Sequence, residues 1–422
     1  MLVTTNINIA GEPGAVMRVL FTTLPGAGPF HPLVPLARSL EESGHEVAFT
    51  TSRSYCGTVQ SAGFHCFPAG YDWHLGDRET LYAHVKGLQP DCNAPFSPLA
   101  DIFAAFLPPS MVPDLLTLAQ SWQPDVIVRD PMEFAGCVVA EVLGLPHAAC
   151  GPLFSFWDGA WHGPPGEIGK PNLCDLRRRY GLSSDPDLSM LYRYLYLAFL
   201  PPIFPDPAVA LPGTVHFLQP VCFNQSDSYA PPMWLAHLPE RPTVHASLGT
   251  VFHRTPGVFA AIIAGLREED INLVVAIGCD QDPAAYGQQP PNVYIERYIA
   301  HSLLLPHCDA FVTHAGFSSV MAGLEQGLPM VAVPLAGDQP SNAQRCSALG
   351  VARVIGPDER TPEAFRTAVR EVLRDPSYGK NAARLRQEIQ LLPGPQHAVQ
   401  LLERLVQVGR PIMSSSQSVK GA

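Results

Sequence analysis

The chain has 422 residues, of which 46% are apolar and 15% are charged, and its formal net charge is −11. This length and composition suffice for two to three domains with buried cores. The negative charge argues against a nucleic-acid partner or an anionic membrane, because both bind basic patches. Ten cysteines occur without a CxxC pair, which is typical of reduced thiols in a cytoplasmic enzyme. The sequence also has no HExxH motif and no Cys/His cluster, so we predict no metal site.

Residues 1–16 lack the basic segment and apolar core of a secretory signal, and we expect them to form a disordered leader. No apolar run approaches the length of a membrane span, so we expect no membrane partner.

The first half alternates apolar strands with helices. Strands are predicted at Arg18–Thr23, Glu46–Thr51, Asp125–Arg129 and His147–Cys150, with helices at Pro32–Ser43 and Phe134–Leu143. This alternation predicts a parallel sheet with helices on both faces. Residues 70–120 look irregular because prolines interrupt them, whereas residues 175–200 look helical.

The second half repeats this order after a Pro-rich linker at 219–242. Strands are predicted at Thr243–Ser247, Leu273–Ile277, Val293–Glu296, Ala310–Thr313 and Met330–Val333, and late helices at Pro362–Leu373, Asn381–Leu391 and His397–Val408. The predicted fold class is α/β, with two Rossmann-like doubly wound domains. The predicted segments are domains at 17–218 and 243–392, a C-terminal helix at 393–410 and a disordered tail at 411–422.

The most informative stretch runs from Phe311 to Gly350. A turn at His314 follows a buried strand, and Ser318 and Ser319 open a helix. The start of a helix offers unpaired backbone N–H groups and a positive dipole end, which suit a diphosphate. The next strand leads to Asp338 and Gln339, a pair that can hold vicinal sugar hydroxyls by accepting and donating hydrogen bonds.

This stretch resembles the donor-binding signature of family 1 glycosyltransferases, in the HAG…DQ…NA form of actinobacterial natural-product members. The matching residues are His314, Gly316, Ser319, Pro329, Asp338, Gln339 and Asn342. The resemblance implies the GT-B fold, in which two domains face each other across a cleft and the final helix packs back on the first domain. It also implies that the C-terminal domain binds a nucleotide-diphosphate sugar as substrate, with no cofactor, and that the N-terminal domain binds the acceptor.

Other donor contacts follow from the same resemblance. Ser247, Gly249 and Thr250 stand where the family places an SxG(S/T) turn against the diphosphate. Tyr298 is expected to stack on the nucleobase, with the Ile299 backbone reading the edge of the base. Plain turn formation and core packing are the alternatives for these positions.

One departure from the family bears on the donor. Plant members carry a glutamate eight residues after the signature histidine, and this residue binds the ribose hydroxyls. The corresponding residue here is Ala322. Because a deoxyribose needs fewer such contacts, the change favours a dTDP-sugar over a UDP-sugar.

A second departure concerns the catalytic base. The family histidine that deprotonates the acceptor aligns with Pro29, which cannot accept a proton. His31, at the expected N-cap of the next helix, and Asp130, at the end of a strand, are the two candidate replacements. Each also has a purely structural alternative, as a capping residue. The glycines before His31 lack the third glycine of a dinucleotide loop, so a nicotinamide enzyme is not expected.

We therefore predict a metal-independent, inverting glycosyltransferase that acts on a hydrophobic natural-product aglycone. Aromatic residues expected to line the acceptor pocket, unless they are plain core, are Trp73, Phe154, Phe156, Trp157 and Trp161. A non-catalytic helper that binds nucleotide-sugar for a partner transferase remains an alternative, as does an epimerase or hydrolase acting on the donor alone. The sequence leaves the oligomeric state open, with a homodimer as one option.

Overall fold

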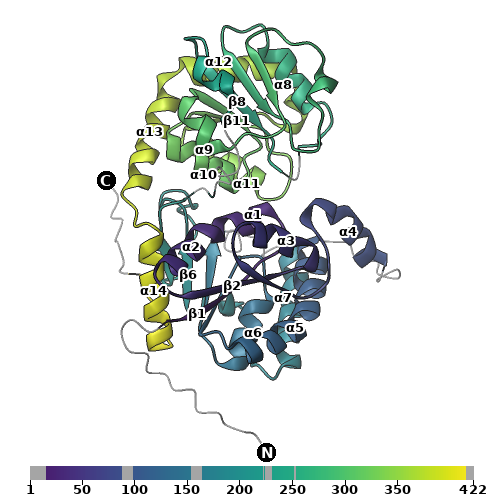
Figure 1. Cartoon of the computed structure of the whole chain (residues 1–422), viewed down its shortest axis with the longest axis vertical. Helices are drawn as coiled ribbons and strands as arrows, with labels where there is room; N and C mark the ends of the chain where they lie inside the picture. The colour runs from purple at the N-terminus through teal and green to yellow at the C-terminus, as the bar shows by residue number, and fades with distance from the viewer. Residues whose placement is uncertain are drawn as a thin grey trace, which may run out of the picture. The chain divides into compact units, whose positions relative to one another are not determined.

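The structure is a computed structural model that describes residues 16–87, 98–153, 164–221, 223, 231–250 and 253–414. The chain divides into two compact units (Figure 1). Unit 1 comprises Met1–Phe199, Pro207–Leu218 and Pro393–Ala422, and unit 2 comprises Leu200–Asp206 and Gln219–Leu392. Most of the predicted leader, and residues 415–422 of the predicted tail, lie outside the described residues.

Unit 1 contains a seven-stranded sheet in the order β3-β2-β1-β4-β5-β6-β7, and every pair is parallel. Its strands are β1 Arg18–Thr22, β2 Glu46–Thr51, β3 His65–Pro68, β4 Val126–Arg129, β5 His147–Gly151, β6 Leu195–Ala198 and β7 Val215–Phe217. At the centre, Val19 of β1 pairs with Val47 on one side and Val126 on the other. The central strands are buried along most of their length because helices cover both faces of a parallel sheet.

The helices of unit 1 confirm part of the expected pattern. Apart from the last helix of the chain, the α-helices are α1 Ala27–Phe30, α2 Val34–Glu42, α3 Arg53–Ser61, α4 Arg78–Gly87, α5 Leu107–Trp122, α6 Ala135–Leu143 and α7 Pro164–Arg179. The expected irregular region at 70–120 is wrong, since α4, a π-helix at Pro98–Phe106 and α5 occupy much of it. Pro108 lies in the first turn of α5, where a missing N–H costs no helical hydrogen bond.

The segment Asp101–Trp122 is long and apolar enough to cross a membrane by length and composition, with a mean hydropathy of 1.5. The sequence-based statement that no apolar run approaches this length is therefore wrong. Core helices of soluble proteins pass the same test, and Met111, Val112 and Leu115 of this segment pack in a buried cluster of unit 1. One such helix is weak support for a membrane span.

The helical prediction for residues 175–200 is also wrong beyond Arg179, where α7 ends. The short strand β6 follows at Leu195–Ala198, and β7 joins its edge. All four residues of β6 are buried, so the strand lacks the alternation of a half-exposed strand. A short apolar run of this kind cannot be told from a buried helix by periodicity.

Unit 2 contains a six-stranded parallel sheet in the order β10-β9-β8-β11-β12-β13. Its strands are β8 Thr243–Ser247, β9 Asn272–Ala276, β10 Val293–Glu296, β11 Ala310–Thr313, β12 Met330–Ala332 and β13 Ala352–Val354. Its main helices are α8 Val258–Leu266, α9 His301–Leu304, α10 Phe317–Gln326, α11 Gln339–Ala348, α12 Pro362–Arg374 and α13 Pro376–Gln390. Five strands lie where the sequence predicted them, whereas β13 was not predicted.

The second half of the predicted linker packs on unit 2. In the short helix Met233–His237, the ring of Trp234 stacks on Tyr294 at a centroid distance of 4.5 Å. The indole N–H of Trp234 also donates a hydrogen bond to Glu296, at 2.9 Å. These contacts give residues 233–237 a structural role that their proline-rich surroundings did not indicate.

The last helix, α14 Pro395–Val408, belongs to unit 1 and lies beside α2 (Figure 1). The amide of Gln396 donates to the Ser43 hydroxyl at 2.8 Å, and His45 Nε2 lies 3.2 Å from Glu403 Oε1. The chain beyond this helix is ordered further than expected, because Ile412 is buried and its N–H donates to the Tyr194 carbonyl at 2.9 Å. The predicted disordered tail is thus wrong for residues 411–414.

Both sheets reverse their strand order at the first strand. In unit 1 the chain runs outward from β1 to β3 and returns to place β4 on the other side of β1. In unit 2, β8 and β11 have the same relation. Ligands of such sheets bind beyond the carboxyl ends of the strands at this switch point. The loops after β8 and β11, and those after β1 and β4, are therefore the places to look for function.

Candidate active site

The turn after β11 has an unusual backbone. Ala315 adopts φ +62°, a left-handed conformation that costs a non-glycine residue about 1–2 kcal/mol. Its N–H donates to the Thr313 hydroxyl at 3.2 Å, and its carbonyl accepts from the Asn342 side chain at 3.0 Å. Strain of this kind concentrates at functional sites, where surrounding structure maintains it.

The turn places the His314 imidazole against two glycines. A Cβ atom on Gly249 would lie 2.6 Å from His314 Cε1 and Nε2, and one on Gly316 would overlap with Nε2. Gly249 also has φ +73°. The ring therefore fits only because both positions lack a side chain, which explains the glycines of the SLG and HAG sequences in unit 2.

His314 is held in its neutral form. Burial lowers the pKa of His314 to about 4, with a smaller contribution in the same direction from His301. The imidazole is therefore uncharged at physiological pH and carries a single ring N–H, while a hydrogen bond to the Ser247 backbone partly opposes the lowering of its pKa. It lies just before α10, whose N-cap, Gly316, has no side-chain cap. The first N–H groups of α10, of which that of Phe317 bonds the Asp338 carboxylate, and a neutral imidazole thus lie together at the switch point of unit 2.

The Asp338 carboxylate lies beside the start of α10. Burial raises the pKa of Asp338, whereas the Asn342 amide and the backbone N–H of Phe317 favour its charged form. Of the two predicted serines, Ser319 is buried and Ser318 is exposed. The predicted sugar-binding carboxylate and the predicted diphosphate-binding helix start are therefore adjacent.

Gln339 differs from the expectation for a residue that both donates to and accepts from a sugar. Its side-chain oxygen accepts backbone N–H bonds from Leu335, at 2.7 Å, and from Ala336, at 3.0 Å. The turn before α11 thus uses the acceptor of this amide, which leaves its nitrogen as the group for a ligand. Gln339 is buried, so its position is closely determined by packing.

The other predicted donor residues also follow strand ends in unit 2. Ser247 ends β8 and is buried, and its hydroxyl accepts the Gly249 N–H at 3.4 Å, whereas Thr250 is exposed. Tyr298 follows β10 and is half-buried. The Ile299 side chain packs in a buried cluster, which orders the backbone predicted to read the nucleobase.

Two further histidines, which the sequence analysis did not single out, lie below this turn. His245 of β8 stacks on Phe311 at a centroid distance of 5.1 Å, and the edge of the His301 ring contacts both rings. Burial lowers the pKa of His245 to about 3 and that of His301 to about 4. No spacing pattern marks these two residues in the sequence, because the contact exists only once β8, β11 and α9 are assembled.

We expect the protein to lose stability as the pH falls from 6.5 to 4, and His245→Phe to reduce this loss. The folded pKa of His245 lies below its unfolded value of 6.5, so the unfolded chain binds more protons in this window. At pH 5 the expected contribution is about 2 kcal/mol. The measurement is the free energy of unfolding in urea at pH 7 and pH 5. An unchanged pH dependence in the variant would contradict the prediction. The variant also loses the hydrogen bond between His245 and the Val274 carbonyl, but this loss lowers the free energy of unfolding equally at both pH values.

In unit 1, the segment after β1 carries His31. The residue opens a short 3-10 helix, His31–Leu33, between α1 and α2. The N-cap of α2 is Leu33, so the predicted N-cap position of His31 is wrong. Burial, and not the expected helix terminus, lowers the pKa of His31 to about 4. The half-buried imidazole is thus neutral at physiological pH, so its ring can accept a proton, although as a weaker base than a free histidine.

Asp130 follows β4 and is only 1% exposed. Its Oδ2 accepts the Leu24 N–H at 2.6 Å, and its Oδ1 accepts the Met132 N–H at 2.8 Å. Burial raises the pKa of Asp130 to about 7, and these two N–H groups only partly oppose it. Because both oxygens already accept backbone hydrogen bonds, the geometry favours a role in holding the segment after β1 over one as base.

The sequence analysis missed a buried polar cluster next to Asp130. Glu133 accepts hydrogen bonds from the Thr22 hydroxyl and from the N–H groups of Ala135, at 2.5 Å, and Gly136, at 2.9 Å. It therefore caps the start of α6 with a carboxylate. The buried guanidinium of Arg129 donates to backbone carbonyls, among them that of Leu191 at 2.6 Å. The cluster determines the path of the loop that carries Asp130.

We expect Gly136→Ala to lower the free energy of unfolding by about 1–3 kcal/mol. A Cβ atom there would lie 2.6 Å from the Thr22 hydroxyl and 2.7 Å from Glu133 Oε2. The matched control is Gly57→Ala in α3, where nothing lies within 4 Å and alanine should be neutral or stabilising. Thermal and urea unfolding of both variants test this, and equal stabilities would contradict it.

The structure describes only Trp73 among the five predicted acceptor residues. Phe154, Phe156, Trp157 and Trp161 lie outside the described residues. Trp73 is buried in a cluster with Leu24, Leu81, Val85, Ile102 and Leu107. This burial favours a packing role for Trp73.

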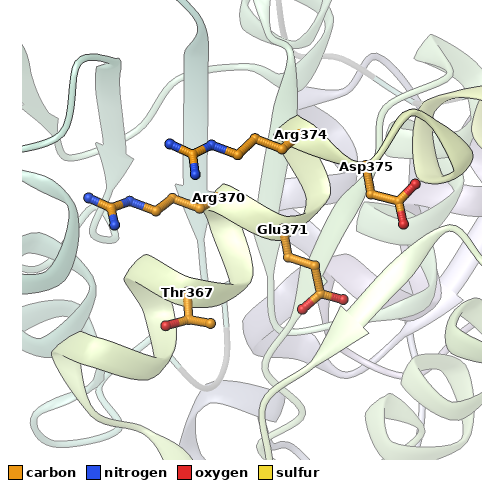
Figure 2. Close-up of a pocket in the computed structure, with 5 residues that line it drawn as sticks. All are labelled: Thr367, Arg370, Glu371, Arg374 and Asp375. Atoms are coloured by element: carbon orange, nitrogen blue, oxygen red, sulfur yellow. The ribbon is translucent and has the colours of Figure 1, made fainter.

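A surface depression of about 600 Å³ lies elsewhere, on α12, and is lined by Thr367, Arg370, Glu371, Arg374 and Asp375 (Figure 2). Two of the polar side chains that line it already hydrogen-bond to other groups of the protein. Arg370 donates two hydrogen bonds to Glu269, at 2.7 and 2.8 Å, and Asp375 caps α13. We therefore assign no chemistry to it. Within the described part of the chain, no three metal-ligating side chains gather.

Solved natural-product glycosyltransferases share this fold over nearly the whole chain. The glycosyltransferase VinC, solved with dTDP, is 25% identical with a TM-score of 0.75, covering 93% of this chain and 100% of VinC. The spinosyn forosaminyltransferase SpnP has the same identity and coverage, with a TM-score of 0.74. Two parallel α/β units with these neighbours define a glycosyltransferase of the GT-B fold, as the sequence resemblance predicted.

Family models and curated relatives specify the group. The model "Erythromycin biosynthesis protein CIII-like, C-terminal domain" matches residues 260–405, and the corresponding N-terminal model matches residues 98–152. The 4'-demethylrebeccamycin synthase of Lentzea aerocolonigenes is 31% identical, covering 92% of this chain and 99% of the relative. The 10-deoxymethynolide desosaminyltransferase of Streptomyces venezuelae is 28% identical, covering 92% and 97%. The chain belongs to the erythromycin biosynthesis protein CIII-like family, whose relatives here are glycosyltransferases of actinobacterial antibiotic pathways.

Proposed function

We propose that the protein transfers a sugar from a dTDP-sugar to a hydrophobic natural-product acceptor, with inversion at the anomeric carbon and without a metal. The observation that carries the proposal is that the start of α10 has the neutral His314 just before it in the chain and the Asp338 carboxylate at the N–H of its first residue, Phe317. This arrangement offers N–H donors to a diphosphate and a carboxylate to sugar hydroxyls.

Two observations support the dTDP donor. Ala322, at the position of the plant ribose-binding glutamate, is apolar and only 4% exposed, so its side chain offers no hydrogen bond to a ribose hydroxyl. The neighbour VinC was solved in complex with dTDP. A thymidine nucleotide, whose sugar lacks the 2′-hydroxyl, fits this site better than a uridine nucleotide.

The curated relatives support a natural-product acceptor without specifying it. Their names include aklavinone, 10-deoxymethynolide and tylactone as acceptors. Members of one family thus glycosylate different compounds. We propose a hydrophobic aglycone for this chain, with a cytoplasmic location that agrees with the eight free thiols among its described cysteines. The homodimer remains a prediction.

In the proposed reaction the acceptor hydroxyl oxygen attacks the anomeric carbon as the bond from that carbon to the diphosphate breaks. His31 of unit 1 takes the proton from the acceptor, and dTDP leaves with the electron pair of the broken bond. In unit 2, His314 and the N–H groups of α10 stabilise the negative charge that grows on the leaving diphosphate. Asp338 and the Gln339 amide nitrogen hold the sugar hydroxyls.

The test is a panel of dTDP- and UDP-sugars with phenolic and other apolar aglycones, followed by mass spectrometry of the products. Glycosylated product, with dTDP-sugars preferred, is the expected result. Tight binding of dTDP with no product from any pair would favour the non-catalytic helper, which Pro29 at the usual histidine position keeps open. Consumption of the donor without an acceptor would favour the epimerase or hydrolase.

A further inference from the structure

The side chain of Asn342 connects the two loops of the donor site. Asn342 lies one turn inside α11, and its Nδ2 donates to the Ala315 carbonyl at 3.0 Å and to Asp338 Oδ2 at 2.8 Å. An amide nitrogen carries two N–H groups, so one Asn side chain serves both acceptors. A hydroxyl has one hydrogen to donate, and an ionised carboxylate has none.

The first of these bonds acts on the strained turn. Ala315 has φ +62°, and the residues on either side of it are His314 and Gly316, which position the imidazole and begin α10. The Thr313 hydroxyl holds the N–H of Ala315, and Asn342 holds its carbonyl. Without the second bond, Ala315 can relax toward negative φ, which would turn both the imidazole and the first N–H groups of α10.

The second bond acts on the carboxylate. Asp338 and Asn342 are four residues apart on α11, so their side chains lie on the same face of the helix. The bond from Asn342 occupies one side of Oδ2 and orients the carboxylate beside Phe317. A free Asp338 would have several rotamers, and a sugar would have to select one of them.

We propose that Asn342 is a positioning residue of the donor site, which holds the phosphate-binding turn and the sugar-binding carboxylate at fixed positions relative to each other. The inference rests on the proposed function, because it assumes that this turn and this carboxylate bind the two ends of a nucleotide-sugar. It adds a residue that contacts neither substrate nor reacting atoms and acts through Ala315 and Asp338.

The structure provides a matched control. Asn381 Nδ2 donates to the carbonyl of Gly350 at 3.1 Å, and Gly350 has φ +67°. Both asparagines are half-buried, lie on helices of unit 2 and hold the carbonyl of a left-handed residue. Gly350 follows α11, however, whereas Ala315 lies in the donor turn. Loss of Asn381 should therefore affect stability without affecting the donor.

The experiment measures dissociation constants for dTDP and dTDP-glucose by isothermal titration. We expect Asn342→Ala to weaken binding of dTDP-glucose by about 10-fold to 100-fold, because a hydrogen bond to a charged group and one to a strained turn are both lost. Binding of dTDP should weaken less. Asn381→Ala should bind both ligands like the wild type.

A second substitution separates positioning from general damage. Glycine adopts positive φ without the penalty of alanine, so Ala315→Gly in the Asn342→Ala background should recover part of the affinity for dTDP. The extra loss specific to dTDP-glucose should remain, since Asp338 is still unsupported. If Asn342→Ala does not fold, Asn342→Leu, which branches at the same carbon and lacks both N–H donors without adding a charge, makes the same test.

Wild-type affinities in Asn342→Ala, losses of equal size in Asn381→Ala, or no recovery with Ala315→Gly would each overturn the inference. Failure of the proposed function gives a different pattern. If wild-type protein binds neither dTDP nor dTDP-glucose, the donor site is wrong and the positioning role falls with it. If wild-type protein binds both but transfers no sugar, the proposed reaction fails while the binding data still decide the role of Asn342.

Discussion

Replacing His31 by alanine should lower kcat for sugar transfer by about 100-fold to 10,000-fold, the usual contribution of a positioned general base. The affinity for dTDP should not change, because His31 belongs to unit 1 and the donor residues belong to unit 2. The folded pKa of about 4 means that the imidazole stays unprotonated down to about pH 5, so wild-type kcat should not fall between pH 8 and pH 6. Steady-state kinetics and dTDP titration on the same protein test both statements.

His65→Ala is the control for this substitution. His65 is exposed and begins β3, so it lies at the opposite end of its strand from the loops of the switch point. Asp130→Asn is the competing variant. If it abolishes transfer and leaves the fold intact, while His31→Ala retains transfer, then Asp130 is the base and the assignment to His31 is wrong.

Gly316→Ala should lower kcat/KM for the donor by about 100-fold to 1,000-fold, comparable to losing one donor of an oxyanion site. The added Cβ would overlap with His314 Nε2, so the imidazole must leave its place between Gly316 and Gly249. Initial rates at varied dTDP-sugar concentration measure the effect.

Two further variants make this prediction specific. Gly379→Ala in α13 is the control, since nothing lies within 4 Å of its added Cβ, and it should retain full activity. In a His314→Ala background, Gly316→Ala should add little, because the imidazole that it displaces is already absent. Additive losses in the double variant would show that Gly316 acts independently of His314.

Much of the fold could be predicted because parallel strands covered on both faces are apolar and are bounded by turn residues. The predicted bounds match the structure for β2, β8, β10 and β11. The missed strands are β3, β6, β7 and β13, each of three or four residues, a length at which periodicity alone does not separate a strand from a helix. The π-helix at Pro98–Phe106 and α5 were missed because the prolines that suggest loops there are accommodated within helices.

The order of polar residues along the chain by itself predicted the proposed donor site in outline. His314 after one strand, and Asp338 and Gln339 after the next, must reach the same sheet edge, since parallel strands end at the same side. The family resemblance, and with it the expectation of a nucleotide-diphosphate sugar as donor, followed from that order alone. The departure from the family at Pro29 could also be recognised in the sequence, because a proline side chain has no group that accepts a proton.

Only the tertiary structure decided how these residues are used. The glycine at 249 makes room for a ring sixty-five positions away, and the Asn342 amide holds a turn twenty-seven positions away. The side-chain oxygen of Gln339 accepts a hydrogen bond from the turn before α11, and the Asp130 carboxylate accepts one from the segment after β1. Such roles depend on which hydrogen-bonding groups burial leaves unoccupied. That is a property of the packed chain, and residue type and spacing do not carry it.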